Sequence, residues 1–318
     1  MMVSCERVEA KLSFIIPLFN EKESIAELYQ GIVNAMQKLK SGYEIIFVDD
    51  GSTDGSFNII KSLRQKDTFV KGLRLRRNFG KSVALNKGFR LAEGDILFTM
   101  DADLQDDPGE IPRFINKISE GFDLVSGWKQ SRKDPFLSKN LPSKLFNFMV
   151  RWGSGVKLHD FNCGFKAYKR HAIEKLYLYG EMHRFIPALL HAQGYKVAEI
   201  PIRHHVRQYG KSKFGLNRFS HGTFDFLTVL FLTRFLKRPM HFFGGIGTLV
   251  SFSGLLICLY LTCLWFSGEM IGHRPLLTLG VLLILIGMQM VTTGFVAEMM
   301  NYSNRSHDLD DIVDEWLG

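Results

Sequence analysis

The sequence predicts an α/β fold with a mostly parallel sheet, followed by two transmembrane helices that form a hairpin. Three observations support this prediction. Short strands rich in Ile, Val and Phe alternate with helices over roughly the first 215 residues, a pattern typical of βαβ units. Two long runs without a charged residue follow near the C-terminus, and acidic residues gather where three predicted strands end.

The strands and helices of the first part are predicted from apolar periodicity and from the polar residues between them. Apolar runs bounded by turn residues indicate strands, and longer amphipathic segments indicate helices. The predicted strands are Leu12–Pro17, Glu44–Val48, Phe69–Leu75, Asp95–Met100, Phe122–Ser126, Gly164–Tyr168 and Lys196–Ile200. The predicted helices are Glu23–Leu39, Asp54–Gln65, Lys81–Ala92, Gly109–Glu120, Lys139–Arg151 and Arg184–Ala192.

Two apolar segments near the C-terminus, Phe242–Ser267 and Pro275–Ala297, contain 26 and 23 residues without a charge. Each exceeds the ~20 residues needed to cross a hydrocarbon core of ~30 Å. Seven residues separate them, so we expect a tight hairpin with both ends on one side; a pair of buried core helices is the alternative. Small residues let such helices pack closely, and the segments contain Gly244, Gly245, Gly247, Gly254, Gly280, Gly287 and Gly294.

Charge is distributed unevenly along the chain. Residues 239–318 carry two basic and seven acidic side chains, a net charge of −5, which leaves +13 on residues 1–238 of a chain whose total is +8. A basic part joined to an apolar part favours work at an anionic membrane surface or on anionic substrates. Nucleic acid is the competing interpretation; we expect none to bind, because the basic residues are dispersed and no nucleic-acid-binding motif is present.

The sequence therefore divides into four parts. We expect an α/β domain at 1–215, an interfacial amphipathic segment at 216–241, two spans within 242–300 (about 242–267 and 275–297), and an acidic tail at 301–318. A core helix of the first domain is the alternative for the second part. Arg234, Lys237 and Arg238 precede the first span, which predicts that the first domain and both termini are cytoplasmic.

The two spans contain no charged side chain at mid-depth. A transport path or proton relay would normally require one. We therefore expect the hairpin to be a membrane anchor or an assembly surface, with a homo-oligomer through the hairpin as one possibility.

Acidic residues follow three of the predicted strands, and ligands bind beyond the carboxyl ends of strands in open α/β sheets. Asp101 and Asp103, just after the fourth strand, are two residues apart, and Gln105 offers a further oxygen. Such hard oxygens can hold Mg²⁺ or Mn²⁺, which would neutralise a diphosphate leaving group. The other residues at these strand ends are Asn20, Glu21, Asp49, Asp50, Asp54 and Asp106.

Motifs in a fixed order carry a family resemblance. They are Pro17-Leu-Phe-Asn-Glu21, Asp49-Asp-Gly-Ser-Thr-Asp54, Arg77-Asn-Phe-Gly-Lys81, Asp101-Ala-Asp-Leu-Gln-Asp106, Asp160-Phe-Asn-Cys-Gly-Phe-Lys166 and Arg207-x-x-Gly210-x-Ser-Lys213. The chain resembles, over nearly its whole length, the polyprenyl-phosphate glycosyltransferases. These are inverting enzymes of the GT-A fold that include dolichol-phosphate mannose synthases and bacterial undecaprenyl-phosphate glucosyltransferases.

The resemblance implies metal-dependent transfer of a hexose, with inversion, from a UDP- or GDP-linked sugar to polyprenyl phosphate. It implies a multi-pass protein of the bacterial plasma membrane that acts at the cytoplasmic face. A membrane synthase acting on another lipid or on a polysaccharide acceptor is the alternative. Processive synthases typically carry Gln-x-x-Arg-Trp, whereas Phe148 stands at the Gln position before Arg151-Trp152. The motifs leave the sugar, the nucleotide and the polyprenol length open.

The resemblance also implies roles for individual residues. It gives nucleotide-sugar binding to Pro17, Asn20, Glu21, Asp49, Asp50, Lys81, Asp101 and Ala102, and the metal to Asp101, Asp103 and Gln105. It gives catalysis to Asp160, Asp103, Arg207 and Lys213. Two phosphate groups must also meet in one site, which requires cations, and the candidates for the acceptor phosphate are Lys129, Arg132, Arg184 and Lys211. Asp160 would act as a base or orient the incoming phosphate, and pairing with Lys166 or Arg184 is its alternative. Lys129 and Arg132 have a solvated surface as their alternative.

Overall fold

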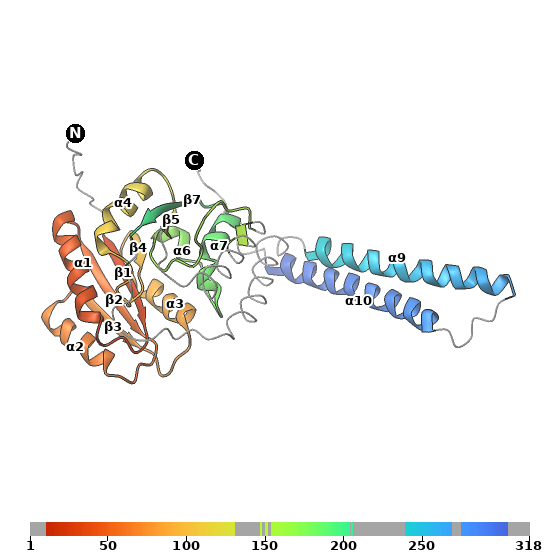
Figure 1. Cartoon of the computed structure of the whole chain (residues 1–318), viewed down its shortest axis with the longest axis horizontal. Helices are drawn as coiled ribbons and strands as arrows, with labels where there is room; N and C mark the ends of the chain where they lie inside the picture. The colour runs from red at the N-terminus through yellow and green to blue at the C-terminus, as the bar shows by residue number, and fades with distance from the viewer. Residues whose placement is uncertain are drawn as a thin grey trace. The chain divides into compact units, whose positions relative to one another are not determined.

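The structure, a computed structural model, describes residues 11–130, 147, 150–151, 154–203, 205, 239–268 and 275–304. The chain divides into two compact units, Met1–Leu230 and Phe231–Gly318. The cyan and blue helices in Figure 1 belong to the second unit, and the other labelled elements belong to the first.

A seven-stranded sheet forms the centre of the first unit, in the order β3-β2-β1-β4-β6-β5-β7 among the described residues. β1 is parallel to β2 and β4, β2 to β3, and β5 to β7, whereas β6 is antiparallel to β4 and β5. The prediction of a mostly parallel sheet is therefore confirmed. The strands are β1 (Leu12–Leu18), β2 (Tyr43–Asp49), β3 (Val70–Arg74), β4 (Ile96–Thr99), β5 (Leu124–Lys129), β6 (Lys166–Lys169) and β7 (Val197–Ile202).

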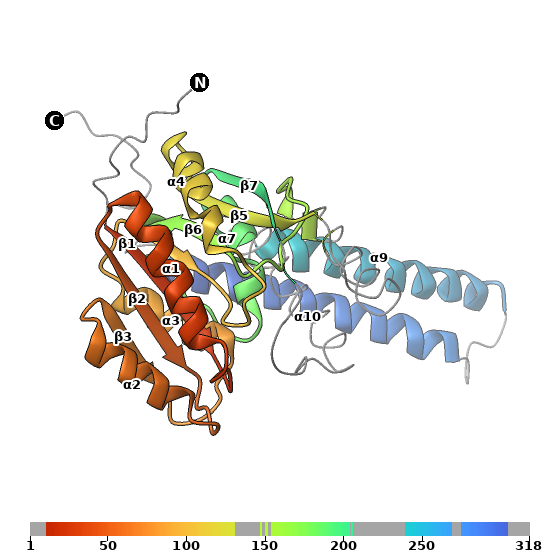
Figure 2. The same cartoon turned by 60° about the vertical axis from the view of Figure 1, so that its left-hand side comes forward.

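Helices cover both faces of this sheet, as Figure 2 shows for α1 and α3. Alternate residues of β1, among them Phe14 and Ile16, join the core formed with α1 and α4. Ile15 points to the other face, where it lies against Gly88 of α3. Because both faces are covered, all seven residues of β1 are buried, which explains its largely apolar sequence. The helices are α1 (Ile25–Leu39), α2 (Ser56–Lys66), α3 (Lys81–Leu91), η1 (Pro108–Glu110), α4 (Ile111–Ser119), α6 (Arg170–Ile173), η3 (Met182–Arg184) and α7 (Ile186–Ala192).

The element boundaries differ from the predicted ones in two instructive places. The predicted helix Gly109–Glu120 begins with the 3₁₀ turn η1, which the Asp107 side chain caps by accepting from Gly109 N at 2.8 Å. The predicted helix Arg184–Ala192 is divided into η3 and α7, with a proline in the first turn of α7. Most of the predicted helix Lys139–Arg151 lies outside the described residues.

The second unit contains two long helices, α9 (Pro239–Phe266) and α10 (Pro275–Asn304). Their most apolar windows have a mean hydropathy of 2.1 each, and both helices are long enough to cross a membrane. Most of their large apolar side chains are exposed, for example Leu249 and Phe266, as expected of surfaces that face lipid. α9 begins before its predicted span, and α10 continues to Asn304, beyond its predicted end at Ala297. The added turns include the charged Glu298, whose carboxylate accepts from Met240 N at 3.3 Å.

Glycines at intervals of seven residues bring α9 and α10 into close contact. A Cβ atom added at Gly247 would lie 2.6 Å from the carbonyl oxygen of Gly287, and one added at Gly254 would lie 2.5 Å from that of Gly280. Both distances are too short for any larger residue without a shift of the backbone. The hairpin therefore depends on backbone-to-backbone packing, the mode that small residues allow in membranes.

We predict that Gly254→Leu destabilises the hairpin by about 1–3 kcal/mol, the usual effect of inserting carbon atoms into a packed interface. Unfolding of the full-length protein by SDS measures the change. Gly245→Leu is the matched control, because a Cβ atom there would meet no other atom within 4 Å. Equal stability of the two variants would contradict the glycine contact.

Candidate functional site

Three loops meet at the carboxyl edge of β1, β2 and β4, because these strands are parallel neighbours. The loops after β1 and β2 are bonded to each other through Asn20. Its backbone N–H donates to Ser52 Oγ at 2.8 Å, and its side-chain oxygen accepts from Thr53 N at 2.8 Å. Asn20 has a φ of 54°, a left-handed conformation that Asn tolerates better than most residues. Hydrogen bonds therefore hold the loops after β1 and β2 in a fixed arrangement.

Asp49 and Asp50, at the end of β2, shape the neighbouring backbone. Asp49 is fully buried and accepts from Ser52 N at 2.8 Å. Asp50 accepts from the N–H groups of Phe79 and Gly80, at 2.7 and 2.9 Å, just before α3 begins. Burial outweighs these two bonds and raises the pKa of Asp50. Both carboxylates thus have partners within the protein.

Asp101 follows β4 and forms an ion pair with Lys81, the first residue of α3. Burial opposes ionisation of Asp101, but the ammonium groups of Lys81 and Lys129 outweigh it and hold the pKa of Asp101 well below its usual range. Gly164 lies against the carboxylate, so that any Cβ atom at this position would overlap it. Asp101 is therefore a fixed, ionised carboxylate that already holds one cation.

The turn after Asp101 presents further oxygen atoms. Leu104 has a φ of 59°, which is rare for a residue with a branched side chain and is typical of functional loops. This conformation lets the backbone N–H of Gln105 approach Asp103 Oδ1 at 3.3 Å. Asp103 and Gln105 are both partly exposed, whereas Ala102 between the two carboxylates is buried.

The donor set on this turn fits a small divalent cation. Two carboxylates and an amide are hard oxygen ligands, and Mg²⁺ or Mn²⁺ commonly completes such a set with phosphate oxygens. Within the ranges that the structure describes, no group of three or more His, Cys, Asp or Glu side chains could hold a metal by itself. A cation here would consequently need oxygens from Gln105 and from a bound ligand.

Lys129, at the end of β5, proves to be a buried counter-ion. Its side chain is 11% exposed, and its Nζ lies 3.1 Å from Oδ1 of Asp106, whose side chain is fully buried. Burial disfavours the ammonium, but Asp106, Asp101 and Asp103 outweigh it and raise the pKa of Lys129. The solvated-surface alternative for Lys129 is therefore wrong, and its predicted role toward an acceptor phosphate stays a prediction.

Asp160 lies in a loop that closes on Lys166. Asp160 is buried and accepts from Asn162 N at 3.1 Å. The buried ammonium of Lys166 donates to the carbonyl oxygens of Phe161 and Cys163. Lys166 thus organises the short segment that carries Asp160. Arg184, also buried, forms an ion pair with Glu181.

His183 is a neighbour of the site that the sequence did not reveal. Its Nδ1 lies 3.1 Å from Ser82 Oγ, beside Lys81 at the start of α3. Burial, followed by the charges of Lys81 and Arg184, lowers the pKa of His183 well below its usual value. The imidazole is therefore neutral at physiological pH. His183 belongs to none of the motifs found in the sequence, so only its position in the fold could reveal that it is a neighbour of the site.

The structure brings most of the predicted residues to one edge. Asn20, Glu21, Asp49, Asp50, Lys81, Asp101, Ala102, Asp103 and Gln105 lie on the three loops or at the start of α3, and Pro17 is buried within β1. Lys129 contacts Asp106 in the loop that also carries Asp101 and Asp103, and Gly164 joins Asp101 to the loop of Asp160. Arg132, Arg207, Lys211 and Lys213 lie outside the described residues.

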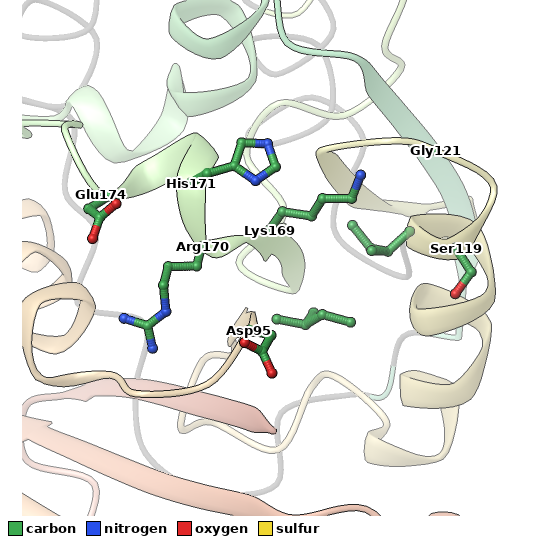
Figure 3. A pocket seen from close by; sticks show the side chains of 9 residues that line it. Asp95, Ser119, Gly121, Lys169, Arg170, His171 and Glu174 are labelled. Atoms are coloured by element: carbon green, nitrogen blue, oxygen red, sulfur yellow. The ribbon is translucent and has the colours of Figure 1, made fainter. Parts of the chain in front are cut away.

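A separate cavity of about 550 Å³ lies at the opposite, amino end of β4. Figure 3 shows its lining, which includes Asp95, Lys169 and Arg170. Its cations are already engaged: Lys169 Nζ lies 3.2 Å from Asp123, and Arg170 Nε donates to the carbonyl oxygen of Gly94 at 2.9 Å. The acid-rich edge offers the oxygens of Asp101, Asp103 and Gln105, so it is the better candidate for a metal that would bind an anionic substrate.

Comparison with known proteins gives matches of three kinds. A family model described as Glycosyl transferase family 2 matches residues 13–177. A protein of Rhizobium johnstonii named dodecaprenyl-phosphate galacturonate synthase is 39% identical over 295 residues, which are 91% of this chain and 87% of that protein.

The third comparison concerns solved structures. Glucosyl-3-phosphoglycerate synthase of Mycobacterium tuberculosis, crystallised with Mn²⁺, UDP-glucose and phosphoglyceric acid, matches with a TM-score of 0.53 and 18% identity, over 70% of this chain and 79% of that one. The same enzyme with UDP matches with a TM-score of 0.52 and 18% identity, over 70% and 80% of the two chains. At this identity the likeness shows the fold alone, and the fold is the one that the sequence predicted.

We predict that Lys129→Met destabilises the full-length protein by about 3–5 kcal/mol, because it leaves the carboxylate of Asp106 buried without its counter-ion. Adding Asp106→Asn to this variant removes the uncompensated charge and should restore most of the loss. Urea unfolding in detergent, followed by circular dichroism, measures both variants. If Lys129→Met alone were as stable as the wild type, the stabilising role of the Lys129–Asp106 pair would be contradicted.

Proposed function

The chain belongs to glycosyl transferase family 2 and is a glycosyltransferase, and we propose that it transfers a hexose from a nucleotide sugar to polyprenyl phosphate. One observation carries this proposal. The identity of 39% to dodecaprenyl-phosphate galacturonate synthase extends over 91% of the chain. Since residues 1–238 are only about three quarters of the chain, the similarity includes part of the apolar hairpin as well as the α/β unit.

The donor is proposed to bind at the acid-rich edge. Asn20, Glu21, Asp49 and Asp50 are proposed to contact the nucleoside, together with Pro17, Ala102 and the Lys81–Asp101 pair. The carboxylates would accept hydrogen bonds from ribose hydroxyls or base N–H groups. UDP is the favoured nucleotide because the structural neighbour binds UDP-glucose, and a hexuronic acid is the favoured sugar because the relative is named for galacturonate.

Asp101, Asp103 and Gln105 are proposed to hold Mg²⁺ or Mn²⁺ against the donor diphosphate. When bound, such a cation neutralises the charge that develops on the leaving group. The protein contributes a preorganised turn, in which the positive φ of Leu104 and the close approach of Gly164 fix the ligand positions. Little reorganisation is then needed when the reaction occurs.

The acceptor phosphate needs little activation. A phosphate monoester has a second pKa near ~6, so it is largely dianionic at neutral pH. Asp160 is proposed to orient this nucleophile or to act as a base, in a loop that Lys166 closes. Arg207 and Lys213 are proposed to act in catalysis, and Lys129, Arg132, Arg184 and Lys211 to compensate the charge of the acceptor.

The proposed setting is the cytoplasmic face of a bacterial plasma membrane. The α9–α10 hairpin would anchor the chain, residues 216–241 would lie in the interface, and the acidic tail and both termini would be cytoplasmic. The lipid acceptor then stays in the bilayer while its phosphate reaches the site. The hairpin also offers a surface for a homo-oligomer.

The proposal predicts that the purified protein converts short-chain polyprenyl phosphate to a glycosylated product with one nucleotide sugar of a panel. The panel contains UDP-galacturonic acid, UDP-glucose, UDP-N-acetylglucosamine and GDP-mannose, and mass spectrometry identifies the product. We expect the uronic acid donor to be used best. Transfer to a sugar or polysaccharide acceptor in place of the lipid phosphate would contradict the proposal.

Asp103→Asn should lower the rate of transfer by several orders of magnitude, since ligands of a catalytic metal are typically this important. Thermal unfolding should stay unchanged, because the Asp103 side chain is partly exposed. Asp95→Asn, at the opposite end of β4, is the matched control and should retain activity. Wild-type turnover in Asp103→Asn, or undiminished turnover of the wild type in EDTA, would refute the metal's role.

A further inference from the structure

Lys81 occupies a helix position at which a lysine does not stabilise the helix. It is the first residue of α3, and the first turn of this helix contains no acidic residue. The N-terminus of a helix carries a partial positive charge and disfavours cations. The side chain of Lys81 instead reaches Asp101, which follows β4. The contact with Asp101 therefore accounts for the lysine.

The Asp101 carboxylate lies between Lys81 and Gly164. Both of its oxygens are close to Gly164, where an added Cβ atom would be 2.4 Å from Oδ2 and 2.7 Å from Oδ1. Oδ1 contacts Lys81. A divalent cation bound by Asp101 would thus lie beside the ammonium of Lys81.

We propose that the Lys81 ammonium is an exchangeable stand-in for the divalent cation at Asp101, and that it moves to a donor phosphate when metal and nucleotide bind together. The inference rests on the function proposed for this site. An ammonium and a divalent cation on one carboxylate repel each other, so metal binding favours the release of Lys81. The diphosphate brought by the nucleotide sugar is then an anion within its reach.

Exposure separates Lys81 from the other lysines near the site. The side chains of Lys81 and Asp101 are each 30% exposed, so Lys81 can move without crossing the core. Lys129 is held by the fully buried Asp106, and Lys166 is buried and donates to two backbone carbonyls. Of these three cations, Lys81 is the one that can change its partner.

Exchange of this kind couples metal binding to nucleotide binding. Without nucleotide, the metal must displace Lys81 into solvent, so it binds weakly. With nucleotide, Lys81 gains a new anionic partner, so the metal binds more tightly, and by linkage the metal strengthens nucleotide binding by the same factor. Asp101 thereby keeps a counter-ion both before and after the donor arrives.

The test is Mn²⁺ binding to the full-length protein, measured from the electron paramagnetic resonance signal of free Mn²⁺ with and without UDP. Lys81→Met removes the competing charge while keeping the length of the side chain. We expect this variant to bind Mn²⁺ without UDP about tenfold more tightly than the wild type, within the usual range of coupling between sites. UDP should then strengthen its Mn²⁺ binding by a smaller factor than in the wild type.

Two further variants serve as controls. Lys87→Met changes an exposed lysine on the same helix and should bind Mn²⁺ as the wild type does, whereas Lys81→Arg keeps a cation and should retain weak binding without UDP. If the wild type binds both Mn²⁺ and UDP but Lys81→Met binds Mn²⁺ no more tightly than the wild type does, the exchange of Lys81 is refuted and the proposed donor site is not. A wild type that binds neither Mn²⁺ nor UDP would overturn the proposed donor site together with it.

Discussion

Negative charge crowded at one edge of a sheet is the constraint on which the first unit depends. Parallel pairing of β1 with β2 and β4 brings their carboxyl ends together, and with them the carboxylates of Asp49, Asp50 and Asp101. Neighbouring carboxylates repel each other, and burial disfavours their ionised forms. The surrounding residues supply the compensation: backbone N–H groups for Asp49 and Asp50, an ammonium for Asp101, and another for Asp106.

The sequence was sufficient to predict what depends on local pattern. β1 and β2 were recognisable because strands covered on both faces are largely apolar, and the acidic loops because each directly follows a strand. The partners of these acids were not predictable in the same way. Lys129 meets Asp106 only because β5 joins the sheet beyond β6, and His183 meets Ser82 only because η3 packs against α3. Such pairings depend on strand order and on packing between distant segments.

The hairpin also contains contacts that could not be predicted from the sequence. The sequence displays many glycines in the two spans, and their number indicates close packing. It does not reveal which of them face the other helix. Gly245 and Gly247 are two residues apart, so they lie on nearly opposite sides of α9. Gly247 meets the backbone of Gly287, whereas the surroundings of Gly245 are open, and this difference follows from the rotation of each helix about its axis.

The type of partner decides which carboxylates of the edge are available for chemistry. Asp50 is held by two backbone N–H groups at the start of α3, so turning it toward a metal would break the end of that helix. Asp106 is held by a lysine that is nearly as buried as itself. Asp101 is held by a partly exposed side chain, which can leave without disturbing any backbone. The edge therefore contains carboxylates whose partners are fixed and, in Asp101, a carboxylate whose partner can leave. A carboxylate of the second kind can accept another cation without a change in the backbone.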